Sequence, residues 1–388
     1  MRCKSSSTDN PESYQAGCEL GEALAEIEPE AVVLFSSIRH DLDDLFEGLR
    51  DAFDDRPVEF IGGTGAGVYG SAGMLAFGAS ALGLSGGGAV SVTTAVQAGA
   101  DVDAFAAGRA CAQTLIDRAP GPIHFALAFT DLSVDGAAAV DGIQAALAAP
   151  IAGGLTGDDA TFERGYVFAG GGYHRHAVAL LGFSGELAFA VNSASGWTPA
   201  GATGVIEAAQ GAVVERISGQ TALDFVSAQL DSPTPIVDIG DIPLAAYVGD
   251  DEHFLLRSPA RLEPRAGSIR YLGNIPIGTR VRVCWATPEQ VLAGVDQALA
   301  GLDPLGFTPS GVVLMSCAGR QALLGGVMEE EVARVKARLG PELPLVGMPS
   351  YGEIGPFRGP DGRHTGSYFH NVSIVCVALG APPCAPRF

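Results

Sequence analysis

Basic residues are scarce in this chain, and lysine is almost absent. The 388 residues include 44 Asp and Glu but only 23 Lys and Arg, which gives a formal net charge of −21. Lys4 and Lys336 are the two lysines. Nucleic-acid binding depends on clustered cations that neutralise phosphates, and an excess of acids disfavours anionic membranes. We therefore expect no nucleic-acid partner.

Long unbroken apolar runs are also missing. No charged residue occurs from Ile61 to Ala100, but glycines interrupt this stretch in GGTGAGVYGSAG and GLSGGG. A membrane helix needs about 20 mostly apolar residues, so we expect no membrane span. Two buried strands and a glycine-rich crossover explain the stretch better, although residues 71–88 have no role that the sequence assigns. The first 20 residues lack the apolar core of a signal peptide, and residues 1–30 are predicted to be a disordered polar leader.

The cysteines form no recognisable framework. Seven are scattered along the chain, and no CxxC pair occurs. This usage is typical of reduced thiols in a cytoplasmic protein. We therefore expect a cytoplasmic location and no metal site built on cysteine.

A weak internal repeat predicts the fold class. Three times an apolar run ends in small polar residues, at 36–37, 130–131 and 316–317, and a helical pattern follows. A short strand with a glycine loop comes next, and another apolar strand ends the unit. In the first repeat this final strand is predicted at 89–96. We predict an α/β fold with α+β-like mixed sheets, built from β-α-β-β units as a layered helix/sheet sandwich in two halves. The predicted domains span 31–220 and 221–380, their junction lies within 197–282, and residues 381–388 form a tail.

Polar residues at the end of the strand predicted in PIAGGLTGDD suggest a ligand site. Thr156, Asp158 and Asp159 follow an apolar run, and ligands of open α/β sheets bind beyond the carboxyl ends of strands. The alternative is a turn in which one of the two aspartates bonds to nearby backbone N–H groups.

A similar group lies at the end of the strand that GVVLMSCAG predicts over 311–319. Ser316, Cys317 and Arg320 occupy its end. Cys317 is either a nucleophile, if a base lowers its pKa, or a buried structural thiol. The planar guanidinium of Arg320 suits a carboxylate ligand. The alternative for Arg320 is an internal ion pair, with Glu353 as the candidate partner.

The segment SYGEIGPF carries the third group. Ser350, Tyr351 and Glu353 lie together in it, and an extended backbone points Tyr351 and Glu353 in the same direction. We expect these side chains to line one pocket. The alternative is a loop that Glu353 fastens to its neighbours.

Two further patterns are weaker. Gly65–Gly70 matches G-x-G-x-x-G, but a poor helical sequence follows and no acid occurs about 20 residues on, so a tight turn is expected. His174 and His176 are two apart on a predicted strand, where a metal-binding pair and a solvated hairpin face are both open. His370 precedes Asn371, and an accessible histidine can ligate haem.

Several segments together carry a family resemblance. PIAGGLTGDDATFERGYVFAGGGYHRHAVALLGF resembles the FIST N-terminal domain, and GWTPAGATGVIEAAQGAVVERISGQTALDFV resembles the segment that follows it. SCAGRQALLG, PLVGMPSYGEIGPF and YFHNVSIVCVAL are similar to the FIST C-terminal domain. The resemblance runs from about Ala31 to Leu379, and GEIGPF together with HN is its most specific part.

The resemblance implies an intracellular sensor of signal transduction rather than an enzyme. FIST domains are regarded as modules that bind small ligands such as amino acids. The expected output passes through a partner such as a histidine kinase or a cyclic-dinucleotide enzyme. The expected ligand is a small polar molecule bound between the strand ends of two FIST halves, and the cofactor is left open. One alternative is a haem-based nitric oxide sensor that uses His174, His176 or His370, and another is a hydrolase with Cys317 as nucleophile.

Overall fold

A computed structural model describes residues 1–230, 242–248, 253–359 and 363–382, so residues 383–388 of the predicted tail lie outside it. Over these residues the chain forms three consecutive units with one element order and a domain inserted into the third. The first unit comprises β1 (Arg2–Thr8), α1 (Ser13–Ala25), β2 (Ala31–Ser37), α2 (Leu42–Ala52), β3 (Glu59–Gly65), β4 (Val68–Gly70), β5 (Gly73–Leu75) and β6 (Ala79–Ser85).

The second and third units repeat this order. The second comprises β7 (Val90–Ala98), α3 (Ala104–Arg118), β8 (Ile123–Asp131), α4 (Gly136–Ala146), β9 (Ile151–Thr156), β10 (Val167–Ala169), β11 (Gly172–His174) and β12 (Ala177–Gly185). The third comprises β13 (Ala188–Ala194), α6 (Pro288–Ala300), β22 (Pro309–Cys317), α7 (Ala318–Leu324), a 3-10 turn (Gly325–Val327), α8 (Glu329–Leu339), β23 (Leu345–Ser350), β24 (Glu353–Arg358), β25 (His364–His370) and β26 (Ile374–Gly380).

The three units interlock by exchanging hairpins. Each unit supplies four strands of a six-stranded sheet, in the orders β1-β6-β2-β3, β7-β12-β8-β9 and β13-β26-β22-β23. The other two strands of each sheet come from a different unit: β10–β11 extends β3, β24–β25 extends β9, and β4–β5 extends β23. Each unit therefore gives a hairpin to one neighbour and takes one from the other, which closes a ring.

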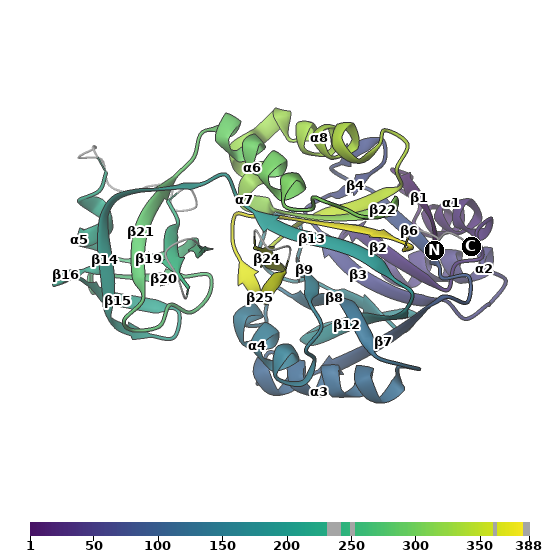
Figure 1. Cartoon of the computed structure of the whole chain (residues 1–388), viewed down its shortest axis with the longest axis horizontal. Helices are drawn as coiled ribbons and strands as arrows, with labels where there is room; N and C mark the ends of the chain where they lie inside the picture. Colours follow the sequence, from purple (N-terminus) through teal and green to yellow (C-terminus); the bar gives the residue numbers. More distant parts are fainter. Residues whose placement is uncertain (231–241, 249–252, 360–362, 383–388) are drawn as a thin grey trace, which may run out of the picture.

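One core lies between the three sheets, and helices cover the outside. Phe35 of β2, Phe129 of β8 and Met315 of β22 belong to the same buried cluster, and the Phe35 and Phe129 rings meet edge to face at 5.5 Å. The other face of each sheet packs on a helix pair, α1 with α2, α3 with α4 and α6 with α8 (Figure 1). The strands are therefore buried on both sides, which explains their continuous apolar runs.

The mixed α/β fold class is confirmed. Two helices begin at side-chain caps: Asp41 accepts from the first backbone N–H groups of α2, and Thr287 forms a capping box with Gln290 at the start of α6. The tight turn expected within Gly65–Gly70 is present at residues 66–67, between the end of β3 and β4. The uncharged stretch 71–88 contains β5 and β6. The strand predicted at 89–96 as the end of the first repeat is β7, which begins the second unit. The strand that ends the first unit is β6.

The prediction of a disordered leader is wrong. β1 pairs with β6 in unbroken register from Arg2 with Ser85 to Thr8 with Ala79. α1 packs closely on α2, and a side chain at Gly17 would lie 2.3 Å from a carbonyl of α2. The polar residues of β1 misled the prediction because an edge strand needs backbone hydrogen bonds rather than an apolar sequence.

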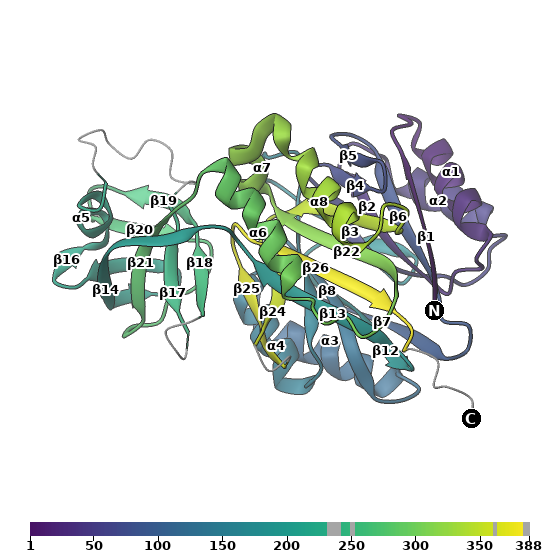
Figure 2. The ribbon, with the colours of Figure 1, turned by 45° about the horizontal axis from the view of Figure 1, so that its top comes forward.

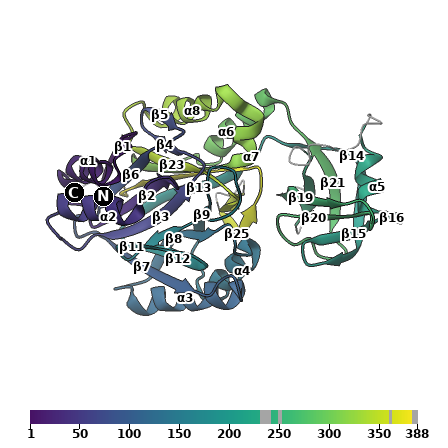
Figure 3. The same ribbon diagram turned by 180° about the vertical axis from the view of Figure 1, so that it is seen from behind.

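The inserted domain separates β13 from α6. It comprises β14 (Thr198–Gln210), β15 (Val213–Ile217), β16 (Gln220–Thr221), α5 (Ala222–Ser227), β17 (Leu244–Tyr247), β18 (Phe254–Arg257), β19 (Pro259–Glu263), β20 (Ser268–Tyr271) and β21 (Arg280–Trp285). It has its own sheet and core cluster, and Figures 2 and 3 show it beside the three units, joined through β14 and β21. The predicted boundary between residues 220 and 221 falls inside β16, so the structural units do not follow it. Within the described ranges, no helix is long and apolar enough to cross a membrane.

Candidate functional site

A cavity of about 390 Å³ opens where β22 and β23 end. Cys317, Ser350 and Tyr351 line its floor, so the structure brings these three predicted site residues together. The inserted domain supplies the opposite wall with Ser258, Pro259, Ala260 and Leu272. The remaining lining comes from the three units: Phe162, Ala318, Gly319, Asn371 and Val372. Among the residues that the structure describes, no charged side chain lines this cavity, although the chain has 67 charged residues, 17% of its length. The wall is therefore apolar with a few hydrogen-bonding groups.

A second cavity of about 300 Å³ adjoins the first. The two share Phe162 and Tyr351 from the units and Leu272 from the inserted domain. Phe162 is 62% exposed and Leu272 is 40% exposed. Large apolar side chains that flank a cavity from two bodies are typical of a ligand-binding groove. We refer to the two adjoining cavities together as the interdomain cavity.

Beneath the interdomain cavity lies a buried carboxyl group. Glu353 accepts from the Ser350 hydroxyl at 2.7 Å, from the Ser373 hydroxyl at 2.8 Å and from the Ser373 backbone N–H at 3.1 Å. Burial raises the pKa of Glu353 to about 7, although these hydrogen bonds oppose the shift. Burial and the neighbouring Glu353 also raise the pKa of the Cys317 thiol far above its ordinary value. A thiolate is therefore disfavoured at Cys317, which argues against the hydrolase alternative.

Asp158 organises the loop that carries Phe162. Its carboxylate accepts from the hydroxyl and backbone N–H of Thr161 and from the N–H groups of Phe162, Glu163 and Arg164. Burial opposes its charge, but these hydrogen bonds prevail and lower the pKa of Asp158. The turn that the sequence offered as an alternative is therefore present, and Asp158 points into its own loop.

Tyr351 fastens this loop to the cavity floor. Its hydroxyl donates to the Asp158 carbonyl and accepts from the Ala160 N–H at 2.9 Å. Its ring meets Phe162 edge to face at 5.0 Å. Asp159 instead forms an ion pair with Arg39 on the surface, and it does not line the interdomain cavity.

The prediction of Arg320 as an anion-binding residue is wrong. Arg320 has 0% exposure, and its Nη2 lies 2.7 Å from a carboxylate oxygen of Glu331 on α8. It also donates to the Ser195 and Val291 carbonyls and to the Ser316 hydroxyl. The guanidinium thus ties α6, α7 and α8 together. The ion-pair alternative holds, but with Glu331 rather than the suggested Glu353.

Thr156 and Ser316 also lie away from the interdomain cavity. Both are fully buried. Ser316 accepts from Arg320, and the Thr156 hydroxyl has no hydrogen-bond partner within the described part of the chain. Small polar residues at these strand ends therefore fill space between the sheets rather than contact the candidate ligand.

The three histidines of the haem alternative are not brought together. His174 lies 3.3 Å from the Ala169 carbonyl, and His176 leaves the strand with φ +54° and contacts Ser133 at 2.8 Å. His370 is buried, and its Nε2 contacts the Gly355 carbonyl at 2.8 Å. None of the three lines the interdomain cavity, so the residues there do not fit a haem with a histidine ligand. Across the described ranges, no three His, Cys, Asp or Glu side chains form a group that could hold a metal.

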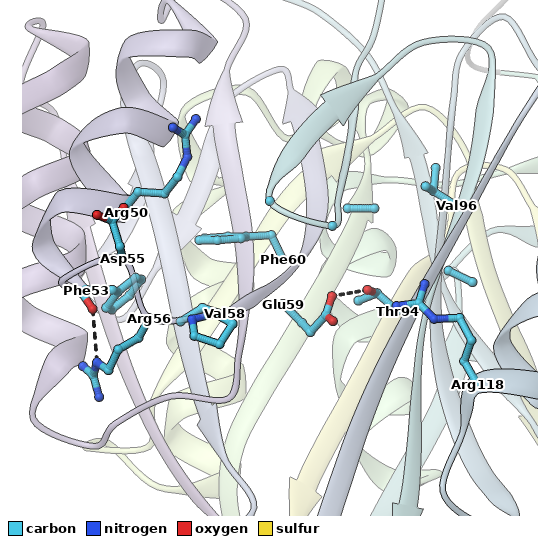
Figure 4. Close-up of a pocket in the computed structure, with 15 residues that line it drawn as sticks. Arg50, Phe53, Asp55, Arg56, Val58, Glu59, Phe60, Thr94, Val96 and Arg118 are labelled. Atoms are coloured by element: carbon cyan, nitrogen blue, oxygen red, sulfur yellow. Dashed lines mark hydrogen bonds between the residues drawn. The ribbon is translucent and has the colours of Figure 1, made fainter.

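A cavity of about 410 Å³ lies elsewhere, between α2, β3 and β7. Figure 4 shows Arg50 and Arg118 on opposite sides of it, with Phe60 and Glu59 between them. Arg56 donates to the Phe53 carbonyl at 3.1 Å. These guanidinium groups point in different directions rather than toward one centre, and no predicted site residue lines this cavity.

Sequence reasoning missed the half of the interdomain cavity that the inserted domain supplies. Ser258 and Leu272 carry no motif, and nothing local connects them to β22 or β23. Asn371 had a signal, because it belongs to the HN element. Its side-chain oxygen accepts from the Ser258 N–H at 3.1 Å, which is a direct contact between the two bodies.

Comparisons with known proteins give the family. Models of the FIST N domain and the FIST C domain match residues 30–220 and 212–356. Among curated proteins, no sequence matches this chain significantly. Similar solved structures include cyanuric acid hydrolase from A. caulinodans (11% identity, TM-score 0.33, covering 98% of this chain and 99% of that one). They also include another cyanuric acid hydrolase structure (9%, 0.36, 98% and 99%) and PurLQS from Thermotoga maritima (9%, 0.22, 76% and 73%). FIST domains are sensory domains of signal transduction that bind small ligands. On the two domain matches, the chain belongs to the FIST family.

Proposed function

We propose that this protein is a sensor that binds one small, uncharged, mostly apolar molecule in the interdomain cavity. The observation that carries the proposal is the lining of the larger cavity, which comes from both bodies and whose described residues carry no charged side chain. Its volume of about 390 Å³ lies within the range of small-molecule sites, roughly 300–1,000 Å³. This ligand class is less polar than the sequence suggested, because Arg320, Asp158 and Asp159 do not reach the cavity.

The position of the cavity also suggests how binding produces a signal. A ligand changes a protein's conformation only if it binds two states unequally. A molecule held between Tyr351 and Leu272 contacts both bodies, so it favours the arrangement in which the inserted domain lies against the strand ends. Asn371 with Ser258 already forms one contact of that arrangement.

The output is proposed to pass through a partner protein such as a histidine kinase or a cyclic-dinucleotide enzyme. This part rests on the family, whose domains are sensory. A cytoplasmic location is proposed because Cys3, Cys18, Cys111, Cys284, Cys317 and Cys376 are all free thiols.

Native mass spectrometry of a cavity-filling variant tests the proposal. Ala260 is an exposed residue of β19 that lines the cavity, so Ala260→Trp fills the space without entering a core. Ala202→Trp is the matched control, an exposed alanine of β14 that lines neither part of the interdomain cavity. We expect a co-purified small molecule on the wild type and on Ala202→Trp but not on Ala260→Trp. A molecule retained by Ala260→Trp would place the ligand elsewhere.

A further inference from the structure

A separate cavity of about 280 Å³ lies on the other side of Asn371. Its lining comes from β13, from the segment that leads into the inserted domain, from β18, from α6 and from β24 to β26. None of the residues described above as lining the interdomain cavity belongs to it except Asn371. The cavity therefore stands at the connection between the two bodies and is distinct from the proposed sensory site.

Two buried polar groups at this cavity lack partners. Trp197 and Ser193 line it, and each is 4% exposed. The Trp197 Nε1 and the Ser193 hydroxyl have no hydrogen-bond partner in the described ranges. Buried polar groups are nearly always hydrogen-bonded, and leaving one unsatisfied costs about 1–3 kcal/mol. A molecule with a hydrogen-bond acceptor would satisfy the indole N–H.

Aromatic rings make up much of the remaining wall. The rings of His253 and Phe357 lie 5.2 Å apart, and those of Phe357 and His370 meet edge to face at 5.0 Å. Burial lowers the pKa of His370 to about 4, so its ring is neutral at pH 7. Gln297 adds an amide, and Arg358, whose guanidinium donates to the Leu302 carbonyl at 2.7 Å, adds a positive charge to the described lining. These groups suit a flat ring with polar atoms at its edge.

We propose that this cavity is a second ligand site, which binds a planar heteroaromatic molecule through a carbonyl oxygen that accepts from the Trp197 indole N–H. The ring of the ligand packs among Trp197, Phe357 and His370, and the Ser193 hydroxyl hydrogen-bonds to its edge. Trp197 directly precedes β14, so the bound molecule touches the segment that connects the inserted domain to β13.

Nicotinamide is a suitable probe, because it is a flat heteroaromatic amide of the required size. The chain has two tryptophans, Trp197 and Trp285, so in Trp285→Phe the fluorescence reports on Trp197 alone. We expect nicotinamide to change that emission with a saturating curve. Calorimetry should then show at least tenfold weaker binding to Trp197→Phe than to Trp285→Phe, and a smaller loss with Ser193→Ala.

The cavity-filling variant completes the test. Ala260→Trp should leave nicotinamide binding unchanged, which separates this site from the interdomain cavity. Equal affinity of Trp197→Phe and Trp285→Phe, or no saturable change in the Trp197 emission, would overturn the site.

Discussion

Replacing Glu353 with glutamine should change how the stability of this protein depends on pH. Glu353 is fully buried beneath the interdomain cavity, and its pKa is raised from an ordinary value of 4.5 to about 7. Between these two values the folded state keeps the proton that the unfolded state has lost. The wild-type carboxyl group therefore favours folding at low pH, and this contribution disappears as the pH rises through 7.

The size of the effect follows from the shift. Each pKa unit corresponds to about 1.4 kcal/mol, so a shift from 4.5 to about 7 contributes about 3 kcal/mol at most. Between pH 5 and pH 8 the wild type should lose about 2–3 kcal/mol through this group. Glu353→Gln does not titrate and keeps a similar shape, so it should not show that loss.

Urea unfolding at several pH values measures the difference directly, provided that the slope against denaturant is unchanged. The free energy of unfolding of the wild type minus that of Glu353→Gln should fall by about 2–3 kcal/mol from pH 5 to pH 8. Glu342→Gln, at an exposed glutamate after α8, is the control and should keep the wild-type profile. A constant difference would mean that folding leaves the pKa of Glu353 unchanged, and a difference that grows with pH would mean that the fold favours its anion. Either result would refute the reasoning.

Four other predictions follow from contacts described above. Arg320→Met leaves the Glu331 charge buried and unpaired, so denaturant unfolding should show a loss of about 3–5 kcal/mol that Glu331→Met partly restores; a neutral single variant would contradict this. Asp158→Asn should cost about 1–3 kcal/mol at pH 7 and less as the pH falls below 4, whereas an effect independent of pH would refute the anionic role. Cys317 should react with iodoacetamide more slowly than a model thiol at pH 8, by mass spectrometry; faster labelling would revive the nucleophile. Gly62→Ala should cost more than about 1 kcal/mol, because its Cβ would lie 2.0 Å from a carbonyl of β2; unchanged thermal unfolding would contradict this.

Local signals in the sequence predicted the elements and the repeated unit, but not how the units join. Apolar runs that end in small polar residues identify β2, β8 and β22 wherever they occur in the chain. By contrast, the pairing of β24 with β9 joins Glu353 to Gly154 across almost 200 residues. No local pattern carries such a pairing, so the exchange of hairpins and the inserted domain emerged only from the structure.

The candidate site divides in the same way. Cys317, Ser350 and Tyr351 could be predicted because Cys317 and Ser350 end neighbouring strands of one sheet and Tyr351 follows directly. The prediction that Arg320 binds an anion failed because the sequence around an arginine that follows a strand does not show whether its partner is a ligand or a buried acid. The discriminating signal was Glu331, an acid beside Val332 on the buried side of α8. Ser258 and Leu272 could not be found, since they reach the site only through the placement of the inserted domain.

Titration with three molecules that share one ring tests the central claim most directly. Indole is neutral, indole-3-acetate carries a negative charge, and tryptamine carries a positive charge. The account predicts by calorimetry that the wild type and Ala202→Trp bind indole more tightly than either charged molecule, and that Ala260→Trp binds none of them. Tight binding of a charged molecule, or undiminished binding of indole to Ala260→Trp, would contradict an uncharged ligand site between the strand ends and the inserted domain.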